Sequence, residues 1–183
     1  ISGKGIVNFD QYLDYIWKNY SSETGIFGVE LSYPQLTCLR EITPLVNVVG
    51  ENIKWFYLVR ENIVAQAISL HIAKATGHYH SYMEKSDDIT PVYDDKEIIN
   101  IIYMLLMQEA AFERYFSARN ITPVRISYES MMSDKCATVE LFRNALGTGP
   151  ETEIIDSGVI KKISGDLNVK FEEKFRREER VFL

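Results

Sequence analysis

The sequence predicts an α/β protein built on a parallel sheet with helices on both faces. One observation is the stretch Lys54–Gly77, where an apolar run that suits a buried strand is followed by a turn and then by apolar residues at helical spacing. A second is the later apolar run Ile121–Glu129, which is again followed by a helical pattern. Repeated strand–helix units with short connections are typical of parallel sheets covered by helices. At 183 residues the chain suits one domain, 1–183, which buries roughly 70% of its unfolded surface.

Local signals place each element in chain order. Asn8 is a suitable cap for a first helix, Pro34 opens a short one, and Gly77 and Gly147 are suitable C-caps. Thr148–Ser164 is typical of a loop. The predicted elements are helix Phe9–Tyr20, strand Thr24–Tyr33, helix Pro34–Arg40, strand Trp55–Val59, helix Ile63–Gly77, helix Asp94–Ala118, strand Ile121–Glu129, helix Ser133–Leu146 and helix Asp166–Arg180.

Composition narrows the class of protein. A net charge of −6 argues against nucleic acid as the main partner, since binding phosphates needs a basic face. The longest apolar stretch, Ile98–Met107, is too short to span a bilayer, and without a visible signal peptide we expect a cytoplasmic protein. Cys38 and Cys136 are isolated and suit reduced, buried thiols. The long apolar helix predicted over Asp94–Ala118 suits a contact between two copies of the chain in a homodimer as well as a position in the core.

Arg60 is the first candidate functional residue. It follows the apolar run Trp55–Val59 directly, and in open α/β sheets ligands lie at the carboxyl ends of the strands. A guanidinium beside a helix N-terminus favours an anion such as phosphate, because both offer N–H donors. Ser69 supplies a further hydroxyl donor for this anion if its face of the helix is turned toward the strand end at Arg60. The alternative is that Arg60 is an ordinary solvated charge or salt-bridge partner.

The residues around Arg60 also resemble a known signature. Its matching positions are Arg60, Gln66-Ala67, Ser69-Leu70, Ala73 and Thr76-Gly77. In this order they resemble the signature of the bacterial trehalose 2-sulfotransferase-like (Stf-type) sulfotransferases. Asn62 departs from it, because the family usually has Asp there, and Glu61 stands where a basic residue is common.

Three further blocks are similar to the same family. The family has a conserved block before the strand that Arg60 follows. Four positions of this chain match it, Gly25, Phe27, Gly28 and Gln35, and Glu30 replaces its usual Lys. Tyr128-Glu129, with Asp134 and Leu146-Gly147 downstream, resembles a later block that we interpret as architecture. The closing block is matched loosely by Lys161, Lys162, Asn168, Phe175, Arg176 and Glu178.

The resemblance implies a sulfotransferase fold similar to P-loop nucleotide hydrolases and the co-substrate 3′-phosphoadenosine 5′-phosphosulfate, with no metal. Arg60 and Ser69 are then expected to hold the donor's 3′-phosphate, and Lys161 or Lys162 to close over it. Gln66 and Tyr79 are expected to line the cleft for a sugar or glycolipid acceptor.

The general base is the least determined role. Glu30, which stands where the family usually has Lys, is a candidate, because attack by a sugar hydroxyl needs a proton acceptor. The alternative is that Glu30 is a partly exposed strand carboxylate. His78 or His80 is the alternative, since histidine has a suitable pKa. The same two histidines are weak evidence for a metal, because no third ligand is in register.

The family also begins with a strand and a loop that cradles the donor's phosphosulfate, and neither is visible here, so we expect an N-terminally incomplete domain. Two other functions stay open. One is a non-catalytic relative that binds nucleotide, and the other is a different P-loop-type nucleotide-handling α/β enzyme, because architecture alone does not specify function.

Overall fold

The structure is a computed structural model that describes residues 5–79, 89–149 and 165–178. Its contacts divide the chain into two compact units, Ile1–Ile53 and Lys54–Leu183. Each unit is described by itself. Lys161, Lys162 and His80 lie outside the described residues.

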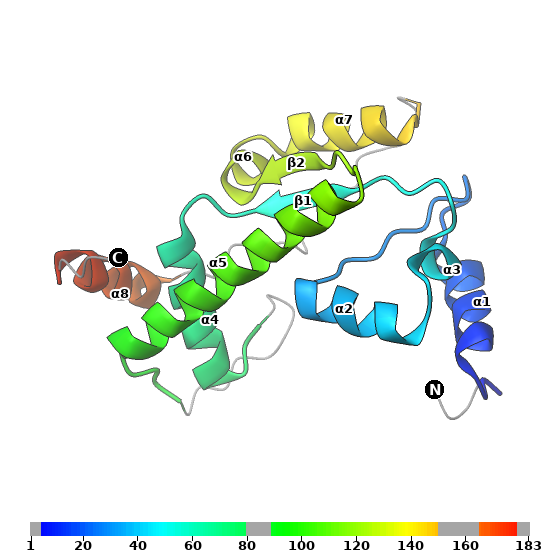
Figure 1. The fold of residues 1–183 in the computed structure, drawn as a ribbon. Coiled ribbons are helices and arrows are strands. Elements are labelled where there is room, and N and C mark those ends of the chain that lie inside the picture. The colour runs from blue at the N-terminus through cyan, green and yellow to red at the C-terminus, as the bar shows by residue number, and fades with distance from the viewer. Residues whose placement is uncertain (1–4, 80–88, 150–164, 179–183) are drawn as a thin grey trace. The chain divides into compact units, whose positions relative to one another are not determined.

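The first unit is helical in its described part (Figure 1). Trp17 holds it together, because its indole N–H donates to the Val48 carbonyl at 2.8 Å and its ring packs against Phe27 with ring centroids 5.1 Å apart. Asn8 caps the first helix by accepting from the Gln11 N–H, as predicted. The helices are α1 (Phe9–Tyr20), α2 (Tyr33–Ile42) and α3 (Leu45–Val49).

The predicted strand Thr24–Tyr33 is wrong. Residues 26–32 carry no strand assignment, and the described residues provide no partner strand for them. Alternating apolar residues predict an extended backbone, but such a backbone becomes a strand only when another strand accepts its hydrogen bonds. Ser32 and Gln35 instead form a reciprocal capping box, which starts α2 at Tyr33.

The second unit contains a small parallel sheet. β1 (Phe56–Val59) and β2 (Val124–Ser127) pair in parallel, with Phe56 opposite Val124 and Val59 opposite Ser127. The helices of this unit are α4 (Ile63–Thr76), α5 (Asp95–Ala118), α6 (Tyr128–Ser133), α7 (Lys135–Leu146) and α8 (Asp166–Arg177).

Helices lie on both faces of this sheet, as predicted (Figure 1). Tyr57 points to α5, where its ring contacts Phe112 and Phe116 at centroid distances of 5.5 and 5.3 Å. The neighbouring Phe56 points to the opposite face and packs on Phe142 of α7 at 4.4 Å, because successive side chains of a strand alternate between faces. The main hydrophobic core lies between α4, α5 and α8, and its buried members are Ala67, Ile68, Ile98, Ile101, Ile102, Phe171 and Phe175.

The boundaries around β2 differ from the prediction. The strand covers Val124–Ser127, and Tyr128 and Glu129 already belong to α6, because the Ser127 hydroxyl accepts from the Ser130 N–H and caps that helix. Asp134 caps α7 in the same way, so the predicted helix Ser133–Leu146 starts at Lys135. The predicted C-caps Gly77 and Gly147 are confirmed, with φ values of 71° and 68° in the left-handed region.

Within the described ranges, no helix is long and apolar enough to cross a membrane, and no group of three or more His, Cys, Asp or Glu side chains is arranged to hold a metal ion. Both cysteines are exposed rather than buried, which corrects the expectation for Cys38 and Cys136. Cys38 belongs to α2, and Cys136 lies in the first turn of α7.

Candidate anion-binding site

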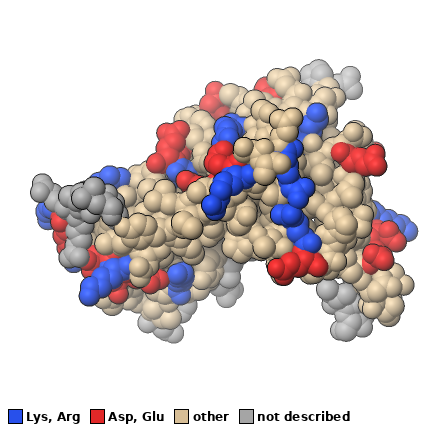
Figure 2. Space-filling model, in the orientation of Figure 1, with Lys and Arg blue, Asp and Glu red and all other residues tan. Residues whose placement is uncertain are grey.

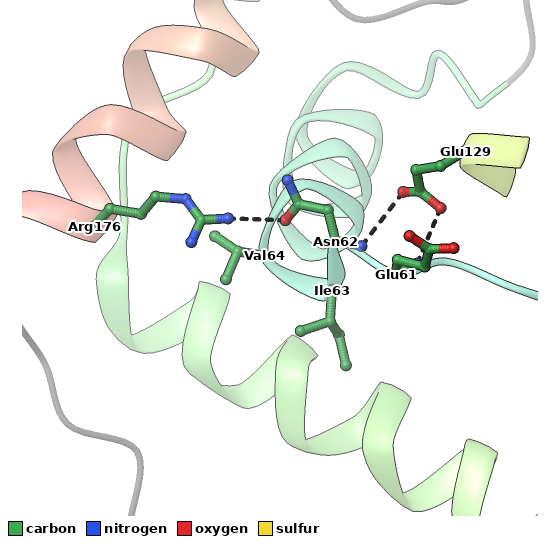
Figure 3. A pocket seen from close by; sticks show the side chains of 6 residues that line it. All are labelled: Glu61, Asn62, Ile63, Val64, Glu129 and Arg176. Carbon is green, nitrogen blue, oxygen red and sulfur yellow. Dashed lines mark hydrogen bonds between the residues drawn. The ribbon is translucent and has the colours of Figure 1, made fainter. Parts of the chain in front are cut away.

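The register of the two strands determines which residues meet at the sheet edge. Val59 pairs with Ser127, so the residues that follow, Arg60 after β1 and Tyr128 after β2, leave the sheet at the same edge. Figure 3 shows the same edge from close by, with Glu129 directed at the backbone of Glu61. The carboxyl ends of parallel strands are where α/β proteins bind ligands.

Glu129 binds the turn that follows β1. Its carboxylate accepts from the Glu61 N–H at 3.0 Å and from the Asn62 N–H at 3.3 Å, and one oxygen lies 3.7 Å from Arg60 Nε. Partial burial opposes ionisation of this carboxyl, but these two backbone N–H groups, the N–H of Glu129 itself and the Arg60 charge outweigh it and lower its pKa. Glu129 is therefore ionised at neutral pH.

Arg60 is held on two sides. Glu129 lies beside its Nε, and the Tyr128 ring lies under the guanidinium, with Cζ 4.7 Å from the ring centroid. The side chain is 19% exposed, and its buried Nε makes no hydrogen bond to any residue that the structure describes. Because a guanidinium is a planar fork of five donors, these two contacts fix its orientation.

Asn62 connects α4 to α8. Its side-chain oxygen accepts from the Ala65 N–H, which caps α4, and also from Arg176 Nη2, both at 3.0 Å. Its side-chain nitrogen donates to Glu172 at 2.8 Å. An aspartate at this position has no such donor, so the departure from the usual Asp matches the presence of Glu172 in this chain.

A shallow pocket of about 420 Å³ lies beside these groups (Figure 3). Two short apolar side chains and several polar groups line it, which suits a small polar ligand with an apolar part. Its lining residues are Glu61, Asn62, Ile63, Val64, Glu129 and Arg176.

The charges at this edge are mixed. Three carboxylates (Glu61, Glu129 and Glu172) accompany two guanidinium groups (Arg60 and Arg176). On the face of the molecule drawn in Figure 2, Lys and Arg side chains also lie among Asp and Glu side chains. An anion at this edge therefore meets two positive groups, Arg60 and Arg176, together with three carboxylates.

Ser69 and Gln66 face the helix α8 rather than the Tyr128–Glu129 pair. Ser69 Oγ accepts from Asn168 Nδ2 at 3.2 Å. Gln66 lies on the same stripe of α4, between Asn62 and Ser69, and its buried side-chain oxygen has no hydrogen-bond partner among the described residues. The structure thus places Arg60 beside Glu129 and Ser69 beside Asn168. Arg60 and Ser69, which were predicted to hold one phosphate, have no contact partner in common within the ranges that the structure describes.

The other predicted residues are distributed elsewhere. Glu30 belongs to the first unit and is exposed in the irregular segment before α2. Tyr79 follows Gly77 and is 48% exposed. The His78 N–H donates to the Thr76 hydroxyl at 3.3 Å.

Sequence reasoning missed the role of Tyr128 and Glu129, which we interpreted as architecture. The signal was present, because residues that follow two neighbouring parallel strands meet at one edge. A strand predicted to run to Glu129 conceals this signal, since it leaves no residue after the strand end. Glu172 and Arg176 were missed for a different reason: their pairing with Asn62 joins positions 110 and 114 residues apart.

Comparison with known proteins identifies similar sequences. The family model described as Stf0 sulphotransferase matches residues 5–178. A protein of Mycolicibacterium smegmatis named trehalose 2-sulfotransferase is 22% identical over 181 residues, which cover 89% of this chain and 67% of the relative. A trehalose 2-sulfotransferase of Mycobacterium tuberculosis is 23% identical over 132 residues, which cover 72% of this chain and 49% of the relative. The chain thus spans between about half and two thirds of the lengths of these relatives.

Proposed function

The chain belongs to the Stf0 sulphotransferase family, and we therefore propose that it transfers a sulfuryl group from 3′-phosphoadenosine 5′-phosphosulfate to a hydroxyl of a carbohydrate or glycolipid. Trehalose is the first acceptor to test, because the two curated relatives are named for it. The observation that carries the proposal is Arg60, an oriented guanidinium at the carboxyl end of a parallel strand, next to the start of α4.

The proposed reaction needs positioning and charge stabilisation. The acceptor oxygen attacks sulfur while its proton passes to a base, and the bond between sulfur and the bridging oxygen breaks with its electron pair on the phosphate oxygen. The donor brings its own leaving group, so the protein contributes by aligning the reactants and stabilising the developing negative charge.

Arg60 and Ser69 are the proposed ligands of the donor's 3′-phosphate. Arg60 fits that role, since a guanidinium fork suits phosphate. Ser69 Oγ accepts a bond from Asn168 and keeps its own hydrogen to donate. The three carboxylates nearby oppose a phosphate dianion, so Lys161 and Lys162 are proposed to supply further positive charge.

The acceptor side of the proposal rests on three residues. Gln66 is proposed to bind the sugar, because its buried oxygen has no partner in the described ranges of the chain and a sugar hydroxyl is a suitable donor for it. Tyr79 is proposed as an exposed stacking surface for a sugar ring. Glu30 is proposed as the general base.

The test is ligand binding on the wild type, Arg60→Ala and a control. Adenosine 3′,5′-bisphosphate, 5′-AMP and ATP are compared by thermal shift. At roughly one hundred times its Kd a ligand stabilises by about 2.7 kcal/mol, which raises Tm by about 5–10 °C in a domain of this size. We expect this rise from the bisphosphate alone, and we expect Arg60→Ala to abolish it.

Arg125→Ala is the matched control. Arg125 is also on the sheet and also pairs with a glutamate, Glu113, but it lies on the α5 side. Equal shifts from all three nucleotides, or a bisphosphate shift that survives Arg60→Ala, would contradict the proposed donor site. Transfer of radiolabelled sulfate from the donor to trehalose then separates an enzyme from a non-catalytic relative.

A further inference from the structure

Glu129 joins the ends of the two strands. It comes from the first turn of α6, after β2. Apart from its own backbone N–H, the groups that its carboxylate contacts lie in the turn after β1: the N–H groups of Glu61 and Asn62 and the Nε of Arg60. It holds these partners across 67 to 69 positions of sequence.

These contacts are not needed to cap α4. Asn62 already caps that helix through its own side chain, which accepts from the Ala65 N–H. The two N–H groups that Glu129 binds belong to residues before the first helical position, Ile63. Glu129 therefore fixes the turn that carries Arg60 rather than the helix.

The contacts also leave one side of Arg60 available. Glu129 lies at the Nε edge, and Tyr128 covers one face of the guanidinium. Within the described residues, Arg60 makes no further ion pair or hydrogen bond, and its charge also acts at longer range on the Glu172 carboxylate. The edge formed by the two terminal nitrogens is the edge that binds phosphate in a bidentate manner.

We propose that Glu129 is the positioning residue for Arg60, holding the Nε edge and the following turn so that the terminal nitrogens face the 3′-phosphate of the nucleotide. The inference rests on the proposed function for the identity of the anion. Glu129 acts through Arg60 and does not itself contact the ligand, because a carboxylate repels a phosphate.

The experiment measures preference for the 3′-phosphate, defined as the Kd of 5′-AMP divided by the Kd of adenosine 3′,5′-bisphosphate, by isothermal titration. Glu129→Gln keeps the size of the side chain and removes its charge. We expect this change to lower the preference about tenfold, the effect of losing one charge-assisted interaction, while the Kd of 5′-AMP changes by less than about twofold. Glu129→Asp, which keeps the charge on a shorter side chain, should recover part of the preference.

Two comparisons separate positioning from general damage. Glu113→Gln removes the carboxylate of another glutamate–arginine pair, Glu113–Arg125, which lies on the α5 side of the sheet, and it should leave the preference unchanged. In the Arg60→Ala background, Glu129→Gln should have no further effect on the preference, because nothing is left for it to position.

A measurement without ligand makes the outcomes distinguishable. Urea unfolding of the wild type, Arg60→Ala, Glu129→Gln and the double variant gives the coupling between the two side chains. A wild type without preference for the 3′-phosphate overturns the proposed function and the ligand half of this inference. A normal wild-type preference that survives Glu129→Gln, or a coupling of zero, overturns the positioning role while the proposed function stands.

Discussion

Asn62, the N-cap of α4, donates from its side-chain amide to the carboxylate of Glu172 in α8 at 2.8 Å. The orientation of this amide follows from its other contacts. Its oxygen must accept from the Ala65 N–H and from Arg176, so its nitrogen is the atom that faces Glu172. Asn62, where the family usually has Asp, therefore supplies a donor that the neighbouring Glu172 carboxylate can use.

Asn62→Asp is expected to destabilise the second unit by about 1 kcal/mol at neutral pH. Aspartate still caps α4, but it loses the donor to Glu172 and places two carboxylates side by side, which Arg176 offsets only in part. Urea unfolding measures the loss. Adding Glu172→Gln to Asn62→Asp should restore most of it, because the new amide donates to the new carboxylate. A double variant no more stable than Asn62→Asp alone would show that the two side chains are not coupled.

Glu129 predicts a pH dependence with a definite sign. Its pKa is lowered in the folded chain, because the backbone N–H groups and Arg60 outweigh the effect of burial. A carboxyl of this kind stabilises the fold above its unfolded pKa, about 4.3, and the stabilisation is lost as the pH falls through the folded value. The free energy of unfolding should therefore fall more steeply below about pH 4.3 in the wild type than in Glu129→Gln. Parallel curves for the two proteins would mean that the contacts of Glu129 do not persist in solution.

Local chemistry made most of this fold predictable. The strand–turn–helix of Lys54–Gly77 appears as β1 and α4, with Gly77 in the left-handed conformation that its position after the helix predicts. α5 starts at Asp95, one residue after its predicted start, because Asp94 is its N-cap. These features depend on neighbours in sequence, and sequence patterns record such neighbours directly.

The rest depends on partners that lie far apart in sequence. Residues 26–32 alternate like a strand, but whether a strand forms depends on a neighbour that no local pattern specifies. The site shows the same limit. Arg60 was predicted from its strand end, whereas Glu129 became recognisable as its partner only when the register of β1 and β2 was known.

Tyr57→Phe is expected to leave stability unchanged or to raise it by up to about 1 kcal/mol. The buried Tyr57 hydroxyl has no hydrogen-bond partner within residues 5–79, 89–149 and 165–178, and burial, with Glu109 and Glu113 nearby, raises its pKa to about 12. Removing this hydroxyl relieves the cost of an unsatisfied polar group while the ring keeps its contacts.

The control for that change is Tyr93→Phe. The Tyr93 hydroxyl donates to Glu178 at 2.9 Å, so its loss should lower stability slightly. The Tm values of both variants, compared with that of the wild type by thermal unfolding, test the prediction. A clear loss of stability in Tyr57→Phe would mean that a partner for the hydroxyl exists in solution.

Gln66→Met distinguishes the effect of Gln66 on stability from its proposed role in binding the sugar acceptor. The buried oxygen of Gln66 has no partner in the described part of the chain, so a thioether of similar size should raise the stability of the ligand-free protein by up to about 1 kcal/mol. If Gln66 binds the acceptor, the same change should raise KM for the sugar and leave the Kd of the nucleotide unchanged. Gln108→Met, on α5, is the matched control and should alter neither ligand. A variant that is more stable and has an unchanged KM would remove Gln66 from the proposed acceptor site, because the unpaired oxygen would then be a packing cost without a ligand to satisfy it.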